Sequence, residues 1–255
     1  MTADASAATP HAGPARRLDA ARVQQMLQTM LSLQEGHNLI IAEDWRTRGL
    51  PFHRAIWVEC AELLDHFGWK WWKKQSPDLG QVHLEIVDIW HFGLSCLMLQ
   101  GDDLGAVAAH FAALPQSSSG TGTATDAAAT PDPEAFRRNV EQLARAALDT
   151  EFSVPRFIAV LQSLPMDFVT LFELYVGKNV LNRFRQANGY ASGTYRKLWD
   201  GREDNVHLLE LAATLPADHP DYITALHDAL GERYRAAANA AQPHGSDDAA
   251  RSSAP

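Results

Sequence analysis

The sequence predicts an all-α fold, and two observations carry this prediction. Apolar residues recur at helical spacing over most of the chain, while the alternation of apolar and polar residues that marks strands is absent. The 255 residues are 46% hydrophobic and 21% charged, which is ordinary for a globular protein and leaves enough apolar residues for a core. This length fits one large domain or two small ones.

The apolar spacing predicts eight helices in chain order. Leu27 and Leu31 lie on one stripe of the first helix. The third is the most apolar: Ile86, Ile89 and Gly93 follow the helical spacing, and further apolar residues spread around it, so we expect it to be buried on most sides. The same apolar surplus is compatible with a partner surface. The predicted helices cover about residues 19–36, 53–67, 81–100, 134–148, 154–163, 166–187, 204–214 and 218–236.

Three segments offer too little apolar surface to offset the entropy cost of ordering them. Residues 1–17 are rich in Ala and Pro, residues 115–133 are low in complexity, and residues 237–255 are rich in Ala, Ser and Pro. We therefore expect a single domain over residues 18–236 between two disordered tails. The segment 115–133 is expected to be a flexible loop or insertion within that domain.

Charge and cysteine content exclude several classes of protein. The chain has 31 acidic and 22 basic residues, a net charge of −9, which argues against a general nucleic-acid binder. Cys60 and Cys96 are too few for a disulfide framework or a four-cysteine zinc site. There is no long uninterrupted apolar run and no signal peptide at the N-terminus, so we expect no membrane span and a cytoplasmic location.

Two acidic pairs lie in apolar surroundings. Glu59 and Glu62 are three residues apart on the second predicted helix, as are Glu85 and Asp88 on the third. Four carboxylates among apolar neighbours need a strong counter-charge to stay ionised. Oxygen ligands favour hard divalent cations such as Mg²⁺; structural ion pairs or a solvated acidic stripe are the alternatives. His91 is better explained as a hydrogen-bonded core histidine than as a di-iron ligand, because the first pair lacks a histidine at the equivalent step.

An aromatic and basic segment, WKWWKK (69–74), separates the two pairs. Tryptophans with neighbouring lysines are suited to hold a flat base close to an anion. The alternative is that these tryptophans anchor a helix end in the core.

A local reversal of charge follows in residues 178–202, which contain six basic residues and one acid. Lys178, Asn182 and Arg185 share one helix face, and this combination of a cation, an amide and a guanidinium suits a polyphosphate. A solvated basic face is the alternative. The acidic EDN (203–205) that follows is expected to cap the next helix.

Together these motifs resemble the dimeric dUTPase family of the all-α nucleoside triphosphate pyrophosphatases. The resemblance covers about residues 20–114 and 165–215, and it implies a helical bundle of that type. Because the acidic pairs precede the 115–133 segment and the basic row follows it, one site would draw on both parts of the chain. The motifs are LQEGHN (33–38), ECAE (59–62), WKWWK (69–73), EIVD (85–88) within EIVDIWHF, and the stretch 177–205.

This resemblance implies hydrolysis of dUTP, and also of dUDP, with dUTP giving dUMP and pyrophosphate, which limits uracil in DNA and supplies dUMP. It implies that Glu59, Glu62, Glu85 and Asp88 hold Mg²⁺ and that one glutamate of the first pair takes a proton from water. Lys178, Asn182 and Arg185 would bind the phosphates. Gln34 and Asn38 would read the uracil edge, and Trp72 or a neighbouring Trp would pack against base or sugar. The resemblance also implies a homodimer.

Two other functions remain open at this point. A related pyrophosphatase could prefer another base, such as that of dCTP, because the amides of Gln34 and Asn38 can exchange donor and acceptor by flipping. A non-catalytic nucleotide-binding helical protein would keep the basic row but would have no need for four carboxylates in apolar helices.

Overall fold

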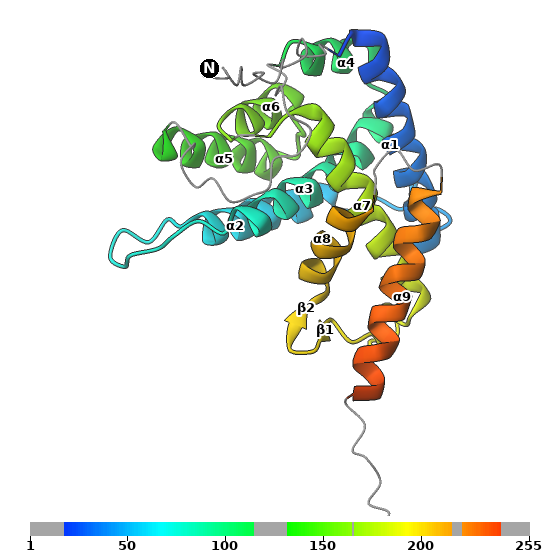
Figure 1. The fold of residues 1–255 in the computed structure, drawn as a ribbon. Coiled ribbons are helices and arrows are strands. Elements are labelled where there is room, and N and C mark those ends of the chain that lie inside the picture. Colours follow the sequence, from blue (N-terminus) through cyan, green and yellow to red (C-terminus); the bar gives the residue numbers. More distant parts are fainter. Residues whose placement is uncertain (1–17, 115–131, 165, 216–220, 241–255) are drawn as a thin grey trace, which may run out of the picture. The chain divides into compact units, whose positions relative to one another are not determined.

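The computed structural model describes residues 18–114, 132–164, 166–215 and 221–240. Within these ranges the chain forms nine α-helices and one pair of two-residue strands, which confirms the all-α prediction (Figure 1). The elements are α1 (Ala20–Ile41), α2 (Phe52–Phe67), α3 (Leu79–Gln100), α4 (Leu104–Ala112), α5 (Pro133–Leu148), α6 (Val154–Gln162), α7 (Phe168–Ala187), β1 (Leu198–Trp199), β2 (Arg202–Glu203), α8 (Asp204–Thr214) and α9 (Tyr222–Ala240).

The chain divides into two compact units. Unit 1 consists of the residues up to Thr29 together with Pro51–Phe172, and unit 2 consists of Met30–Leu50 and the residues from Glu173 onward. The prediction of one domain over residues 18–236 stays a prediction.

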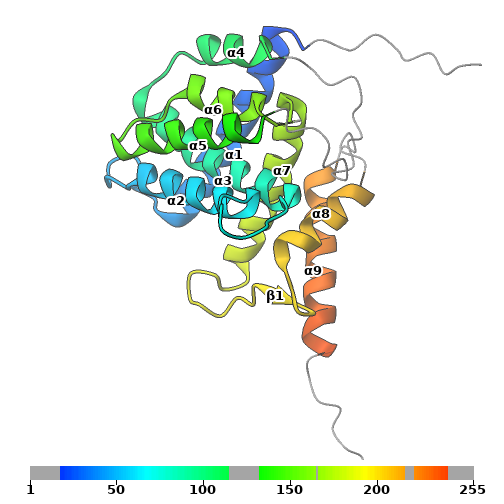
Figure 2. The same ribbon diagram turned by 90° about the vertical axis from the view of Figure 1, so that its left-hand side faces the viewer.

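Unit 1 is built around the antiparallel pair α2 and α3. Figure 2 illustrates the order in which α2, α5 and α6 lie one beside the next. Apolar side chains from each helix meet in a core in which Trp90 of α3 stacks on Phe157 of α6 with ring centroids 4.9 Å apart. Trp90 also packs edge-on against Phe111 of α4. This core fixes the faces of α2 and α3 that carry the acidic pairs.

Helix α3 is buried on most sides, as its sequence predicts. A Cβ atom added at Gly93 would lie 2.4 Å from the ring of Phe152, so glycine is required there for the ring to approach the helix. By length and composition α3 could span a membrane, but most of it is buried in the structure. Its apolar surplus therefore serves the core of its own unit.

Unit 2 places α8, α9 and the β1–β2 hairpin around the C-terminal part of α7. Its core includes Phe184, Trp199 and Leu230. The hairpin pairs Leu198 with Glu203 and Trp199 with Arg202. The two residues between the strands, Asp200 and Gly201, both have positive φ, as the tightest hairpin turns require.

The structure differs from the predicted elements in five places. Helix α1 continues to Ile41, and α4 was not predicted because nine residues give too short a periodic signal. The two-residue strands are too short to show alternation. Helix α9 extends to Ala240 and buries Ala237, so it enters the segment assigned to the C-terminal tail, and Asp132 and Pro133 start α5. The remaining predicted disorder, residues 1–17, 115–131 and 241–255, lies outside the described residues.

Candidate active site

Three of the four predicted metal ligands meet between α2 and α3. One carboxylate oxygen from each of Glu59, Glu85 and Asp88 lies within 4.8 Å of the others. Glu85 is buried, while Glu59 and Asp88 are partly buried. The antiparallel pairing of the two helices brings the ECAE and EIVD motifs together.

These carboxylates carry an unfavourable excess of negative charge. Burial, the charge of Asp88 and a hydrogen bond with Glu85 are the main causes that raise the pKa of Glu59 to about 9. A protonated glutamate at neutral pH relieves the repulsion, and a bound cation would relieve it better. The donor set consists of carboxylate oxygens alone, so it fits a hard divalent cation.

Glu62, the fourth predicted ligand, lies outside this group of three. Its side chain is exposed, although its charge still contributes to the raised pKa of Glu59. A histidine that the sequence analysis did not assign to the site lies beside it: Nε2 of His66 is 3.6 Å from Oε1 of Glu85. His91 is buried in α3, as expected for a core residue.

The tryptophans of the WKWWKK segment are exposed rather than anchored in the core. Trp69, Trp71 and Trp72 are 45%, 90% and 57% exposed, and their rings contact one another edge to face. Core anchorage is therefore the wrong interpretation. An exposed aromatic cluster is consistent with a role for Trp72 in binding.

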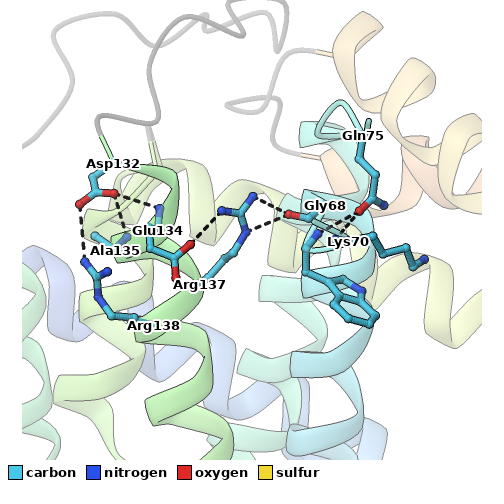
Figure 3. A network of polar contacts seen from close by, with 9 residues as sticks. Gly68, Lys70, Gln75, Asp132, Glu134, Ala135, Arg137 and Arg138 are labelled. Atoms are coloured by element: carbon cyan, nitrogen blue, oxygen red, sulfur yellow. Dashed lines mark hydrogen bonds and ion pairs between the residues drawn. The ribbon is translucent and has the colours of Figure 1, made fainter. Parts of the chain in front are cut away.

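Figure 3 shows how the start of this loop is held in unit 1. Arg137 of α5 donates two hydrogen bonds to the carbonyl oxygen of Gly68, of 2.9 and 2.7 Å. The side-chain oxygen of Gln75 accepts from the backbone N–H groups of Trp69 and Lys70, at 3.1 and 2.7 Å. The first turn after α2 is thus fixed from two sides, while the indole rings stay accessible.

The predicted phosphate-binding row lies on α7 in unit 2 and is not a solvated face. Lys178 is 2% exposed, and its ammonium group donates to Oδ1 of Asn205 at 3.0 Å. Nη1 of Arg185 donates to Oδ1 of Asn182 at 3.1 Å. Arg185 also pairs with the buried carboxylate of Asp204. All three predicted residues belong to one polar network.

The partners of this row, Tyr195, Asp204 and Asn205, were missed as site residues. The sequence analysis assigned EDN (203–205) to helix capping, and Asp204 does start α8. The sequence did contain a signal for Asp204, because this acid comes shortly after the basic stretch 178–202. A basic row that is buried needs a counter-charge, and Asp204 could supply it.

Gln34 and Asn38 are buried on α1 and bonded to each other. Nε2 of Gln34 donates to Oδ1 of Asn38 at 3.0 Å. The hydroxyl group of Tyr175 on α7 faces both Oε1 of Gln34, at 3.1 Å, and the carbonyl oxygen of Met30, at 2.9 Å. Tyr175 thereby holds the amide pair, a contact between distant residues that helical spacing does not predict.

Comparison with protein families decides the class. The family model described as dUTPase matches residues 26–190, about two-thirds of the chain. The chain belongs to the all-α dUTPase family. It is a dUTP diphosphatase, and the dUTPase family in general requires a divalent metal. A search of curated proteins gives no match.

All ten site residues predicted from the sequence lie inside the part of the chain that matches the dUTPase family. Tyr195, Asp204 and Asn205 lie beyond its end at residue 190. The comparison therefore carries no information about the partners of the phosphate-binding row.

Proposed function

We propose that this dUTPase hydrolyses dUTP, and also dUDP, in an Mg²⁺-dependent reaction that gives dUMP, with pyrophosphate as the second product from dUTP. The observation that carries the proposal is the group formed by Glu59, Glu85 and Asp88, whose ligand atoms lie within 4.8 Å of one another. Three carboxylates so close together are stable only with a shared proton or a cation. The reaction would limit uracil in DNA and supply dUMP.

In the proposed mechanism, Glu59, Glu85 and Asp88 would hold the metal, with Glu62 as a fourth ligand. Bound Mg²⁺ would supply Lewis-acid chemistry that stabilises negative charge on the phosphates and lowers the pKa of the attacking water. Glu59 or Glu62 accepts the proton of that water. In the metal-free site the pKa of Glu59 is raised to about 9, so Glu59 must lose its proton when the metal binds before it can act as a ligand or accept a proton from water.

On the substrate side, Lys178, Asn182 and Arg185 bind the phosphates and stabilise the negative charge that develops on the leaving pyrophosphate. Gln34 and Asn38 recognise the uracil edge, and Trp72 packs against base or sugar. The polar network that links Lys178, Asn182 and Arg185 through Asn205 supports a common role for the three residues.

A nucleotide panel tests the proposal directly. We expect release of pyrophosphate from dUTP with Mg²⁺ and none after chelation, and much slower release from dCTP and dTTP. Equal rates on the three nucleotides would overturn the choice of base, and full activity after chelation would overturn the metal mechanism.

A variant pair tests the ligand set. Glu85→Gln is expected to abolish turnover while the helical circular dichroism signal survives, and Glu62→Gln is expected to do the same if Glu62 joins the ligands when the metal binds. Wild-type turnover in Glu62→Gln would reduce the site to the three clustered carboxylates.

We further propose that the enzyme is a homodimer in the cytoplasm, with neither nucleic acid nor a membrane as a partner. The support is the resemblance to the dimeric family and the acidic net charge of −9. Light scattering coupled to size-exclusion chromatography should give twice the chain mass of 28.1 kDa. A single-chain mass at micromolar concentration would contradict the dimer.

A further inference from the structure

Asp204 occupies the centre of the polar network in unit 2. It is fully buried, and each of its carboxylate oxygens accepts a 2.8 Å hydrogen bond from Arg185, one from Nε and one from Nη2. The hydroxyl group of Tyr195 donates a third, also of 2.8 Å. Burial alone would raise the pKa of Asp204, but the hydrogen bonds and charge of Arg185 outweigh it and hold that pKa below its ordinary value.

Most of the hydrogen-bond donors of Arg185 are used within the protein. Of the five N–H groups of a guanidinium, two donate to Asp204, one to Asn182 and one, at 3.3 Å, to Asn205. The plane of the guanidinium is therefore set by the protein before any nucleotide binds, and Asp204 accepts the two shortest of these bonds.

The network reaches the ammonium group of the row through Asn205. Its Oδ1 accepts from Arg185 and, at 3.0 Å, from Nζ of Lys178. One amide oxygen thus connects the two cations of the row, and Asn205 follows Asp204 directly on α8.

The backbone at Asp204 is itself fixed. Its N–H group donates to the carbonyl oxygen of Lys197 at 3.0 Å, next to the β1–β2 hairpin. Trp199 of this hairpin is fully buried, and its carbonyl oxygen lies 2.9 Å from Nε2 of His207 on α8. The hairpin and the first turns of α8 therefore form a rigid platform for the carboxylate.

We propose that Asp204, supported by Tyr195, is the positioning residue of the phosphate-binding row. It orients Arg185 directly and, together with Asn205, fixes Lys178. It acts through these residues and does not itself touch the substrate. The proposal rests on the proposed function, in which the row binds the phosphates.

A positioning role and a plain charge effect predict different kinetics. Removing the negative charge of Asp204 leaves the row more positive, which favours binding of the anionic substrate. Loss of orientation instead weakens the stabilisation of charge in the transition state. We therefore expect Asp204→Asn to lower kcat by about 10- to 100-fold, while KM for dUTP stays unchanged or falls. Tyr195→Phe should lower kcat by a smaller factor.

The control variant is Glu210→Gln. Glu210 lies on α8, as Asp204 does, and forms exposed ion pairs with Arg202 and Arg233. Removing its charge should leave kcat and KM unchanged. A second readout needs no catalysis: the Nε–H signal of Arg185 in nitrogen-15 NMR of the nucleotide-free protein. It should be slow to exchange in the wild type and Glu210→Gln, and lost or fast in Asp204→Asn.

The outcomes separate the two proposals. A kcat of Asp204→Asn within twofold of wild type would overturn the positioning role, as would a loss confined to KM. If Asp204→Asn does not fold, the test uses Tyr195→Phe instead. If this variant has an altered Nε–H signal of Arg185 but an unchanged kcat, the orientation of Arg185 does not affect catalysis and the proposal is overturned. If wild-type protein does not hydrolyse dUTP, the proposed function fails, and the Arg185 signal still tests whether Asp204 orients the guanidinium.

Discussion

One carboxylate oxygen of Glu59 on α2 and one of Glu85 on α3 lie within 4.8 Å of each other. Two carboxylates this close repel unless one of them carries a proton, and burial together with the charge of Asp88 raises the pKa of Glu59 so that it holds that proton. The metal-free site is therefore held together by a proton, and a cation that binds there must displace it.

The first prediction concerns the stability of the metal-free protein. Glu59→Gln keeps a donor toward Glu85 and removes a buried acid that is ionised in the unfolded chain and must take up a proton on folding at neutral pH, so it should raise the free energy of unfolding by about 1–3 kcal/mol. The same variant should lose the rise in Tm that Mg²⁺ gives the wild type. Thermal unfolding with and without Mg²⁺ measures both.

The control for this variant is Glu141→Gln, an exposed acid on α5 in the same unit. It should change neither the Tm nor its response to Mg²⁺. A metal-free Glu59→Gln protein less stable than wild type would contradict the raised pKa of Glu59.

The second prediction concerns protons. Because the pKa of Glu59 is raised to about 9, Mg²⁺ binding near neutral pH should release about one proton per chain. The apparent affinity for Mg²⁺ should rise with pH and level off above pH 9, where Glu59 is already ionised. Calorimetric titrations in two buffers of different ionisation enthalpy measure the released proton, and identical enthalpies in both buffers would refute the prediction.

Helical periodicity explains which parts of the fold could be predicted. The spacing of apolar residues along α2 and α3 predicts both helices, and the acidic pairs set in them predict a common site, of which Glu59, Glu85 and Asp88 are together in the structure. Helix α4 and the β1–β2 hairpin were not predicted, because the spacing of apolar residues becomes visible only over several helical turns or strand alternations.

The unpredicted part of the candidate site consists of contacts between residues far apart in sequence. Asp204 meets Arg185 nineteen residues away, and Tyr175 meets Gln34 across 141 positions. Spacing along one helix places residues on a face, but it does not reveal what packs against that face. The exposure of the tryptophans at 69–72 likewise depends on how Arg137 and Gln75 hold the loop.

The third prediction follows from the hydroxyl group of Tyr175. Tyr175→Phe leaves the buried Oε1 of Gln34 and the carbonyl oxygen of Met30 without this donor, so it should destabilise the protein by about 1–3 kcal/mol. Because the amide pair Gln34 and Asn38 loses its support, the ratio of kcat/KM for dUTP to that for dCTP should fall. Competition between the two nucleotides measures this ratio, and an unchanged ratio would show that Tyr175 has no part in base recognition.

The fourth prediction tests close packing in unit 1. Gly93→Ala would place a methyl group 2.4 Å from the Phe152 ring, and displacing that buried ring should cost about 1–3 kcal/mol. Gly36→Ala on α1 is the matched control, since nothing lies within 4 Å of its added Cβ and alanine favours helix by about 0.4–1 kcal/mol. Urea denaturation should move the two midpoints in opposite directions.

The fifth prediction concerns acid stability and the pair formed by Asp204 and Arg185. The pKa of Asp204 in the folded protein lies below 3.8, its ordinary value, so the ionised group stabilises the fold above that pH. Asp204→Asn leaves a guanidinium that is largely buried without its counter-charge, and this should cost about 3–5 kcal/mol near pH 7. As the pH falls through the folded-state pKa, wild-type Asp204 takes up a proton and the difference between the two proteins should disappear. Urea denaturation of both proteins from pH 7 down to pH 3 measures this difference in the free energy of unfolding. A difference that stays constant over the whole range would mean that Asp204 contributes by packing and not by charge.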